Sequence, residues 1–307
     1  MRFLGRAAIL LLPAAAAPCM QAEQDFRIAG YLPEYRVIGV EAEQVKGLTD
    51  LIVFSVWPKA SGALDASAWP GEKLKKARRL ARGAKARLLV AVGGWGRSTG
   101  FAEMTSREET RGKFAKELMD FCKANEMAGV VYDWEFPSNA KEEAGMGKLL
   151  GDTRRLFEPS GRRVEIAVNP AKTLPREWTA KVDAVQVMSY DNGPRHSTYE
   201  QSVADLDAMA SMGAPAKKLL LGLPFYGRGI ANRDRAMTYA EIHQRFRPGE
   251  DLDEAGGFYF NGPRTLQRKV SLAKEHGLGG VMIWEIGQDA RGRASLLSRL
   301  TQAKKNP

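Results

Sequence analysis

The chain has 307 residues, 44% of them hydrophobic, and its 46 basic and 36 acidic residues give a formal charge of +10. This length and composition are sufficient for one large core, so a second domain is not required. The basic residues are densest at 72–82, where apolar side chains recur at helical spacing, so a solvated helix face is the simplest interpretation. No aromatic residues interleave with them, which argues against nucleic-acid binding. Attraction to an anionic cell wall or lipid surface is the alternative.

The segment 1–22 has the features of a secretory signal peptide. Arg2 and Arg6 form a basic start, and an apolar stretch covers residues 7–17. This stretch is too short to span a bilayer, so we expect a secreted or periplasmic protein without an integral membrane span. A retained anchor is the alternative, although the proline directly before Cys19 argues against lipid attachment there. Removal of the segment takes away two arginines and leaves a charge of +8.

Short β-rich runs alternate with helical patterns along residues 23–307, which is typical of a parallel sheet with crossover helices. Eight β-then-α units can close a barrel, so we predict an α/β fold, a (β/α)8 TIM barrel. The predicted strands are Arg27–Tyr31, Leu51–Val56, Arg87–Val92, Gly129–Glu135, Val164–Val168, Ala184–Ser189, Lys218–Leu223 and Gly280–Trp284. Helical patterns cover residues 40–47, 72–84, 107–125, 141–157, 200–212 and 263–276.

The longest interval between predicted strands, residues 224–279, separates the seventh from the eighth. It contains a predicted helix at Tyr239–Phe246 and a loop rich in glycine and aspartate at Pro248–Gly257. This interval leaves room for a small excursion from the barrel, but not for a full α+β insertion domain.

The predicted fourth strand carries two acids among small, β-branched and aromatic residues. Because strand side chains alternate between faces, Val131, Asp133 and Glu135 would point one way and the aromatic residues between them the other way. Two carboxylates on one strand face are costly to hold inside a fold unless partners or a substrate meet them. Asp133 and Glu135 are therefore the first candidates for catalysis.

Aromatic and acidic residues also follow the other predicted strands, and active sites of such barrels lie at the C-terminal ends of the strands. Aromatic faces stack on pyranose rings while acids and amides bind hydroxyl groups, so this composition indicates a sugar-binding site. Core packing is the alternative for any single aromatic residue. The residues at these positions include Trp95, Tyr190, Asp191, Tyr226 and Trp284.

The sequence offers little support for other chemistries. Gly94, Gly96 and Gly100 do not have the spacing of a nucleotide-binding loop. The three histidines lack the spacing of metal ligands, so we expect no metal site. Once the segment 1–22 is removed, Cys122 is the only cysteine, so no intramolecular disulfide can form.

At these positions the chain resembles glycoside hydrolase family 18, which comprises the chitinases and their chitinase-like lectin relatives. The resemblance extends over nearly the whole chain after the segment 1–22, as motifs in the family's order. The matching segments are Gly30–Pro33, Val92–Trp95, Tyr132–Pro137, Met188–Asp191, Leu221–Arg228 and Gly279–Glu285. The resemblance implies a (β/α)8 barrel and substrate-assisted hydrolysis that retains the anomeric configuration without a cofactor.

Carried over by position, the resemblance implies catalytic roles for Glu135, Asp133 and Tyr190. Glu135 would protonate the glycosidic oxygen and later activate water. Asp133 would hold the acetamide N–H of the substrate and Tyr190 its oxygen, while that oxygen attacks the anomeric carbon and forms an oxazolinium ion. Trp284 would form the floor beneath the distorted sugar. The other implied substrate contacts are Asp191, Tyr226, Trp95, Met188 and Tyr31.

The chain departs from the family in two respects. The fourth-strand pattern D-x-x-D-x-D-x-E has Ala128 and Val131 at its first two acidic positions. Without an acid at 131, Asp133 loses a like-charged neighbour and a possible proton-sharing partner, so we expect slower catalysis or a moved pH optimum rather than no activity. The short interval before the eighth strand predicts an open cleft, which favours endo action or modest processivity.

The favoured interpretation is a secreted, monomeric hydrolase of β-1,4-linked N-acetylglucosamine polymers such as chitin. A non-catalytic chitin-binding lectin on the same barrel is one alternative, which the missing acids favour and the presence of Glu135 disfavours. A hydrolase of another N-acetylglucosamine linkage, in peptidoglycan or N-glycans, is the other. The acetamide-assisted mechanism fits that linkage equally well, and the basic surface suits an anionic wall.

Overall fold

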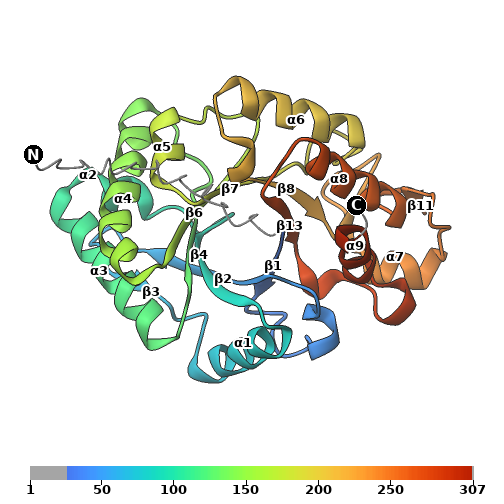
Figure 1. Cartoon of the computed structure of the whole chain (residues 1–307), viewed down its shortest axis with the longest axis horizontal. Coiled ribbons are helices and arrows are strands. Elements are labelled where there is room, and N and C mark those ends of the chain that lie inside the picture. The colour runs from blue at the N-terminus through green and yellow to red at the C-terminus, as the bar shows by residue number, and fades with distance from the viewer. Residues whose placement is uncertain (1–25, 306–307) are drawn as a thin grey trace, which may run out of the picture.

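The computed structural model describes residues 26–305, in which eight parallel strands form a closed ring surrounded by helices (Figure 1). The first strand pairs with both the second and the last, which closes the barrel. The strands are β1 (Arg27–Pro33), β2 (Asp50–Pro58), β4 (Arg87–Gly93), β5 (Gly129–Asp133), β6 (Arg163–Val168), β7 (Ala184–Val187), β8 (Leu219–Pro224) and β13 (Gly280–Trp284). All eight predicted strands and the TIM barrel are therefore confirmed.

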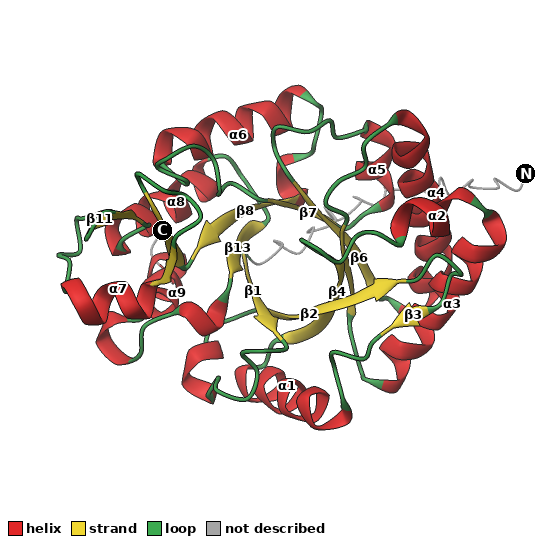
Figure 2. Ribbon diagram, turned by 180° about the vertical axis from the view of Figure 1, so that it is seen from behind, coloured by secondary structure: helices red, strands yellow, loops and turns green. Residues whose placement is uncertain are grey.

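Helices cover the outside of the ring (Figure 2). Their apolar faces pack on outward-facing strand residues. The predicted patterns form α1 (Gly71–Ala84), α3 (Glu108–Ala124), α4 (Ala140–Phe157), α6 (Tyr199–Ser211) and α8 (Pro263–Glu275). Residues 40–47 instead form one 3-10 turn, η1 (Ala42–Val45). Elements that the patterns did not predict are α2 (Phe101–Ser106), α5 (Arg176–Lys181), α9 (Leu296–Lys305) and the 3-10 turns η2 (Glu158–Ser160), η3 (Ala216–Lys218), η4 (Ile286–Gln288) and η5 (Gly292–Ala294).

The interval between β8 and β13 forms the small excursion that its length predicted. Helix α7 (Tyr239–Phe246) has the predicted bounds. A four-stranded sheet lies beside it in the order β10 (Ala236–Thr238), β9 (Tyr226–Gly229), β12 (Phe258–Tyr259) and β11 (Glu254–Ala255). A further short strand, β3 (Leu64–Asp65), pairs with the end of β2.

A buried ionic network occupies the barrel interior at the N-terminal ends of the strands. Arg27 Nε donates to Asp50 Oδ2 at 2.9 Å, and the guanidinium also lies 2.9 Å from Glu165 Oε1. Gln186 extends the network, because its Nε2 donates to Glu165 at 2.9 Å while its Oε1 accepts from the Tyr31 hydroxyl at 2.8 Å. Apolar side chains share the barrel interior with this network; they include Ala91, Val131, Ala167, Leu220 and Met282.

The predicted signal peptide at residues 1–22 lies outside the described residues. Within residues 26–305, no helix has the length and apolar character needed to cross a membrane. Cys122 is a buried free thiol, and burial raises its pKa to about 12.

Candidate active site

The two candidate acids lie at the C-terminal end of β5, where the strand leaves the barrel. The strand ends at Asp133, not at Glu135 as the sequence predicted. The backbone leaves the ladder here because it bonds to the loop after β4: Gly94 N donates to Asp133 O at 2.6 Å, and Glu135 N donates to Ser98 Oγ at 3.0 Å. Asp133 consequently points into the barrel, while Glu135 is half-buried beyond the strand end.

Among residues 26–305, no basic side chain acts on either acid of the pair. Asp133 is 4% exposed, and its Oδ1 has no hydrogen-bond partner among the described residues. Burial and the charge of Glu135 hold the pKa of Asp133 well above its usual range. Burial likewise raises the pKa of Glu135 to about 7, with a donated bond from the Trp95 N–H opposing and the charge of Asp191 adding to the rise. At neutral pH the pair therefore retains a proton.

Aromatic side chains form an apolar lining next to the acid pair. Trp284, the last residue of β13, is half-buried, and its ring centroid lies 4.6 Å from Phe54 and 5.4 Å from Tyr31. Tyr31 is 1% exposed and its hydroxyl bonds to Gln186, so direct contact between Tyr31 and a substrate stays a prediction. The cluster that holds these residues together also contains Val131, Phe136, Met188 and Tyr190.

Asp191 lies across from the acid pair, on the loop after β7, and is held in a left-handed conformation with φ of 61°. Arg228 of β9 donates to both carboxylate oxygens, at 2.8 and 3.0 Å, and His196 Nδ1 lies 3.5 Å from Oδ1. Burial opposes ionisation of Asp191, but the nearby His196 and the two bonds from Arg228 hold its pKa well below the usual range. Tyr226 packs beside this group, with its ring centroid 4.9 Å from His196 and 6.4 Å from Tyr190.

The structure therefore brings most of the predicted site residues together around the barrel mouth. These are Glu135, Asp133, Tyr190, Trp284, Asp191, Tyr226, Met188 and Tyr31. Sequence reasoning missed the roles of Arg228 and His196 in holding Asp191, and it missed Phe54 behind Trp284. The seventh-strand motif contains Arg228, but no sequence pattern indicated that Arg228 would bond to Asp191.

Residues 27–289 match the sequence model of glycosyl hydrolases family 18. The chain belongs to this family. Similar curated proteins include chitinase 1 of Aphanocladium album, which is 26% identical over 270 residues, covering 69% of this chain and 64% of the relative. Probable chitinase 10 of Drosophila melanogaster is 26% identical over 275 residues, covering 66% of this chain and 12% of the relative. The chain thus spans less than two thirds of the length of these curated relatives.

Solved structures share the same barrel. A family 18 chitinase from Flavobacterium johnsoniae superposes with a TM-score of 0.82 at 22% identity, covering 92% of this chain and 94% of the other. A chitinase from Bacteroides thetaiotaomicron gives a TM-score of 0.81 at 24% identity, covering 92% and 97%. At these identities the likeness concerns the fold.

Two residues of the β4–α2 loop border the acid pair of this family 18 protein. The Trp95 side chain is 79% exposed, while its backbone N–H donates to the Glu135 carboxylate. Ser98 lies in the sequence GRSTG, which matches the letters of a serine hydrolase motif. Its hydroxyl donates to Gly94 O at 3.1 Å and Asp133 O at 3.4 Å, and it accepts from Glu135 N. These bonds anchor the loop, so Ser98 is not arranged as the nucleophile of a serine hydrolase.

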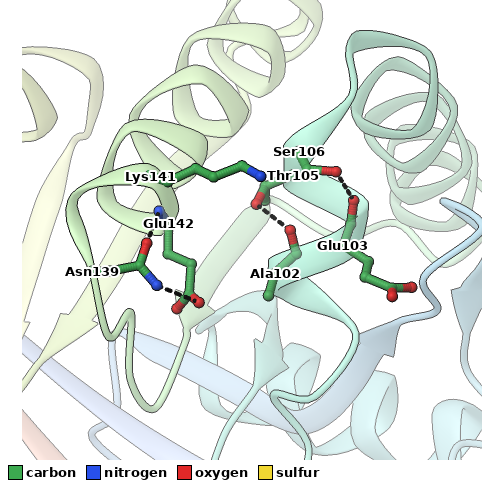
Figure 3. A pocket seen from close by; sticks show the side chains of 7 residues that line it. All are labelled: Ala102, Glu103, Thr105, Ser106, Asn139, Lys141 and Glu142. Atoms are coloured by element: carbon green, nitrogen blue, oxygen red, sulfur yellow. Dashed lines mark hydrogen bonds between the residues drawn. The ribbon is translucent and has the colours of Figure 1, made fainter.

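A hollow of about 310 Å³ lies between α2 and α4 (Figure 3). Its side chains bond locally: Asn139 Oδ1 accepts from Glu142 N at 3.0 Å, and Ser106 Oγ donates to Glu103 O at 2.7 Å. None of the predicted site residues lines this hollow, so it is separate from the family 18 site. The lining residues are Ala102, Glu103, Thr105, Ser106, Asn139, Lys141 and Glu142.

Within residues 26–305, no group of three or more His, Cys, Asp or Glu side chains could hold a metal ion.

Proposed function

We propose that this family 18 protein is a secreted glycosidase that cleaves β-1,4-linked N-acetylglucosamine polymers, chitin or chito-oligosaccharides, by substrate-assisted retaining hydrolysis. The observation that supports it most is the acid pair Asp133 and Glu135. Both acids are desolvated, have no counter-charge from the part of the chain that the structure describes, and lie beside an aromatic platform at the barrel mouth. A desolvated acid that retains its proton near neutral pH is suited to general acid catalysis.

The proposed reaction begins with proton donation from Glu135 to the glycosidic oxygen. The acetamide oxygen of the substrate attacks the anomeric carbon as the leaving sugar departs, so no enzyme carboxylate bonds to the sugar. Asp133 holds the acetamide N–H and stabilises the positive charge of the oxazolinium ion. Tyr190 positions the acetamide oxygen, and Trp284 supports the sugar ring. Glu135 then removes a proton from water. The water attacks the anomeric carbon from the face that the leaving sugar left and breaks the bond to the acetamide oxygen, so the anomeric configuration is retained.

Relatives named chitinases support chitin as the substrate. Hydrolysis of N-acetylglucosamine linkages in peptidoglycan or N-glycans uses the same acetamide chemistry, and the charge of +8 that remains without the segment 1–22 suits an anionic wall. A comparison of soluble reducing ends released from chitin, peptidoglycan and an N-glycosylated protein decides among them. Release from chitin alone supports the proposal, and release from peptidoglycan alone overturns the choice of polymer.

The lectin alternative makes a different prediction with small glycosides. A hydrolase releases a chromogenic group from an N-acetylchitobiose or chitotriose glycoside. A lectin binds chitin and releases nothing.

Export is tested separately: mass spectrometry of the exported protein should find a chain that lacks the segment 1–22.

The pH dependence of kcat/KM follows from the ionisation of Glu135. Its carboxyl must carry a proton to act as the acid, and its pKa is raised from 4.5 to about 7. Activity should therefore fall as the pH rises through about 7, because the ionised form cannot donate. Burial and the charge of Glu135 raise the pKa of Asp133 as well, so its protonation should lower activity again as the pH falls. A pH series with a chitobiose glycoside measures both limbs, and an alkaline limb near the ordinary value of 4.5 would contradict the assignment.

Replacement of Val131 by aspartate tests the departure from the family pattern. Val131 is fully buried in the barrel interior, two residues before Asp133 on the same face. A carboxyl there supplies the missing like-charged neighbour, so we expect Val131→Asp to raise kcat or move the pH profile. Val131→Asn is the matched control, because it is polar and of similar size but cannot ionise. Identical profiles for Val131→Asp and Val131→Asn would refute a role for charge at this position.

A further inference from the structure

A buried lysine, Lys269, bonds to the loop that carries Asp191. Lys269 of α8 is 0% exposed. Its Nζ donates to Ser197 O and Ser197 Oγ, both at 2.8 Å, and to Asn261 Oδ1 at 2.9 Å. All three acceptors are neutral oxygens, and none of them belongs to a carboxylate.

Burial of a charged group costs free energy, which a role in packing alone does not explain. An ammonium group inside a protein loses its hydration, and apolar residues often replace buried charges without loss of stability. What the lysine adds is three directional bonds that converge on Ser197 and its neighbour in space, Asn261. Asn261 Nδ2 also donates to Ser197 O, at 2.7 Å, so the same carbonyl is held from two elements.

The position of Ser197 determines the position of the residues before it. Ser197 Oγ donates to Ser189 O at 2.7 Å, which joins the two ends of the loop after β7. Within the loop, Asn192 N donates to His196 O at 3.0 Å. His196 precedes Ser197 directly and is fully buried, and its Nδ1 lies 3.5 Å from Asp191 Oδ1. Displacement of Ser197 would therefore displace His196 and, through it, Asp191.

We propose that Lys269 is a positioning residue of the active site, which holds Ser197 so that His196 and Asp191 remain against the barrel mouth beside Glu135. The role rests on the proposed function, because it acts on the proton donor through Asp191. Lys269 itself touches neither the acid pair nor the space above it. The charge of Asp191 is one cause of the raised pKa of Glu135, so an Asp191 that moves away leaves Glu135 a stronger acid.

Other ionisable groups surround this connection. Asp253 acts on Lys269 from the loop before β11, and Asp205 and Glu200 act on it from α6. Arg228 donates two side-chain bonds to the Asp191 carboxylate, and Arg233 donates to Asp191 O. The charge of Asp191 also acts on Tyr226. All of these groups are present in both variants compared below, so they do not account for a difference between the variants.

The test compares Lys269→Met with Lys218→Met. Lys218 is a matched control, because its Nζ also bonds to backbone oxygens, Thr179 O and Val182 O at 2.8 Å, but at the opposite end of the barrel. Both variants should lose thermal stability. We expect only Lys269→Met to lower kcat/KM on a chitobiose glycoside, at least about tenfold, because small displacements of site groups have large kinetic effects. Its alkaline pH limb should also move to lower pH by several tenths of a unit.

Equal kinetics for folded Lys269→Met and wild type, with an unmoved alkaline limb, would overturn the proposal, as would an equal loss in Lys218→Met. Hydrogen exchange of the wild type gives a measurement that needs no folded variant. The Asn192 amide should exchange as slowly as the amides of β7, and exchange at the rate of an unprotected loop overturns the role of Lys269. If the wild type hydrolyses none of the glycosides, the proposed function fails, while hydrogen exchange still decides whether Lys269 holds the loop.

Discussion

Replacement of Glu135 by glutamine is expected to lower kcat by roughly 10²–10⁴-fold, the range typical for removal of a general acid. Glutamine keeps the size of the side chain and can accept the Trp95 N–H, but it has no proton to donate. Its KM should change little, since the amide disturbs few contacts of the ground state. Hydrolysis of a chitobiose glycoside at the optimum pH measures the effect, and binding of chitin by the variant shows that the site is intact.

Glu285 provides a demanding control for this substitution. It is another buried acid at a strand end, and burial raises its pKa to about 7 as well. However, its carboxylate accepts from Arg36 Nε at 3.1 Å and from Gly287 N at 2.7 Å, so it is bonded into the rim. Glu285→Gln should therefore lose far less activity than Glu135→Gln. Comparable losses in the two variants would mean that the raised pKa of Glu135 does not mark it as the proton donor.

Replacement of Asp133 by asparagine should be the second most damaging change, with a fall in kcat of roughly 10²–10³-fold, as for removal of other groups that stabilise charge in the transition state. Asparagine can still accept the acetamide N–H through its oxygen. It cannot supply the negative charge that the oxazolinium ion requires, so the loss should appear mainly in kcat. Chitobiose glycoside kinetics, with kcat and KM determined separately, measure it.

The pH profile gives an independent check on Asp133. In the wild type the two acids titrate together, so their apparent pKa values belong to the pair. In Asp133→Asn a single ionisation, that of Glu135, should describe the residual activity. A variant that retains both limbs of the wild-type profile would exclude Asp133 as the second titrating group.

The barrel could be predicted because its strands are marked by separate apolar runs with intervening helical periodicity. The helices α2 and α5 could not, since six residues are too few to show a period. The small sheet beside α7 was missed for a related reason: β11 and β12 are two residues long and pair only after the chain has folded back. The early end of β5 depends on bonds to Ser98 and Gly94, which are distant in sequence.

Some residues of the site could likewise be predicted from the sequence and others could not. Asp133 and Glu135 could be recognised because two acids in an apolar strand are costly whatever surrounds them. The connection from Lys269 to Asp191 could not, because it joins a helix to a loop about 70 positions earlier and depends on a left-handed turn at a non-glycine residue. Long-range polar contacts of this kind leave no periodic signal.

The polar chain in the barrel interior has a consequence for turnover. Tyr31 packs beside Trp284 at the mouth, and its hydroxyl donates to Gln186, which donates to Glu165 of the ionic network. Gln186 is an amide, which neither gains nor loses a proton near neutral pH, so it interrupts a proton relay along this chain. In the proposed reaction each cycle would therefore exchange its hydrogen ions with bulk solvent through the opening that admits the sugar. Occupancy of that opening by a long polymer would then also govern how fast Glu135 regains its proton for the next bond.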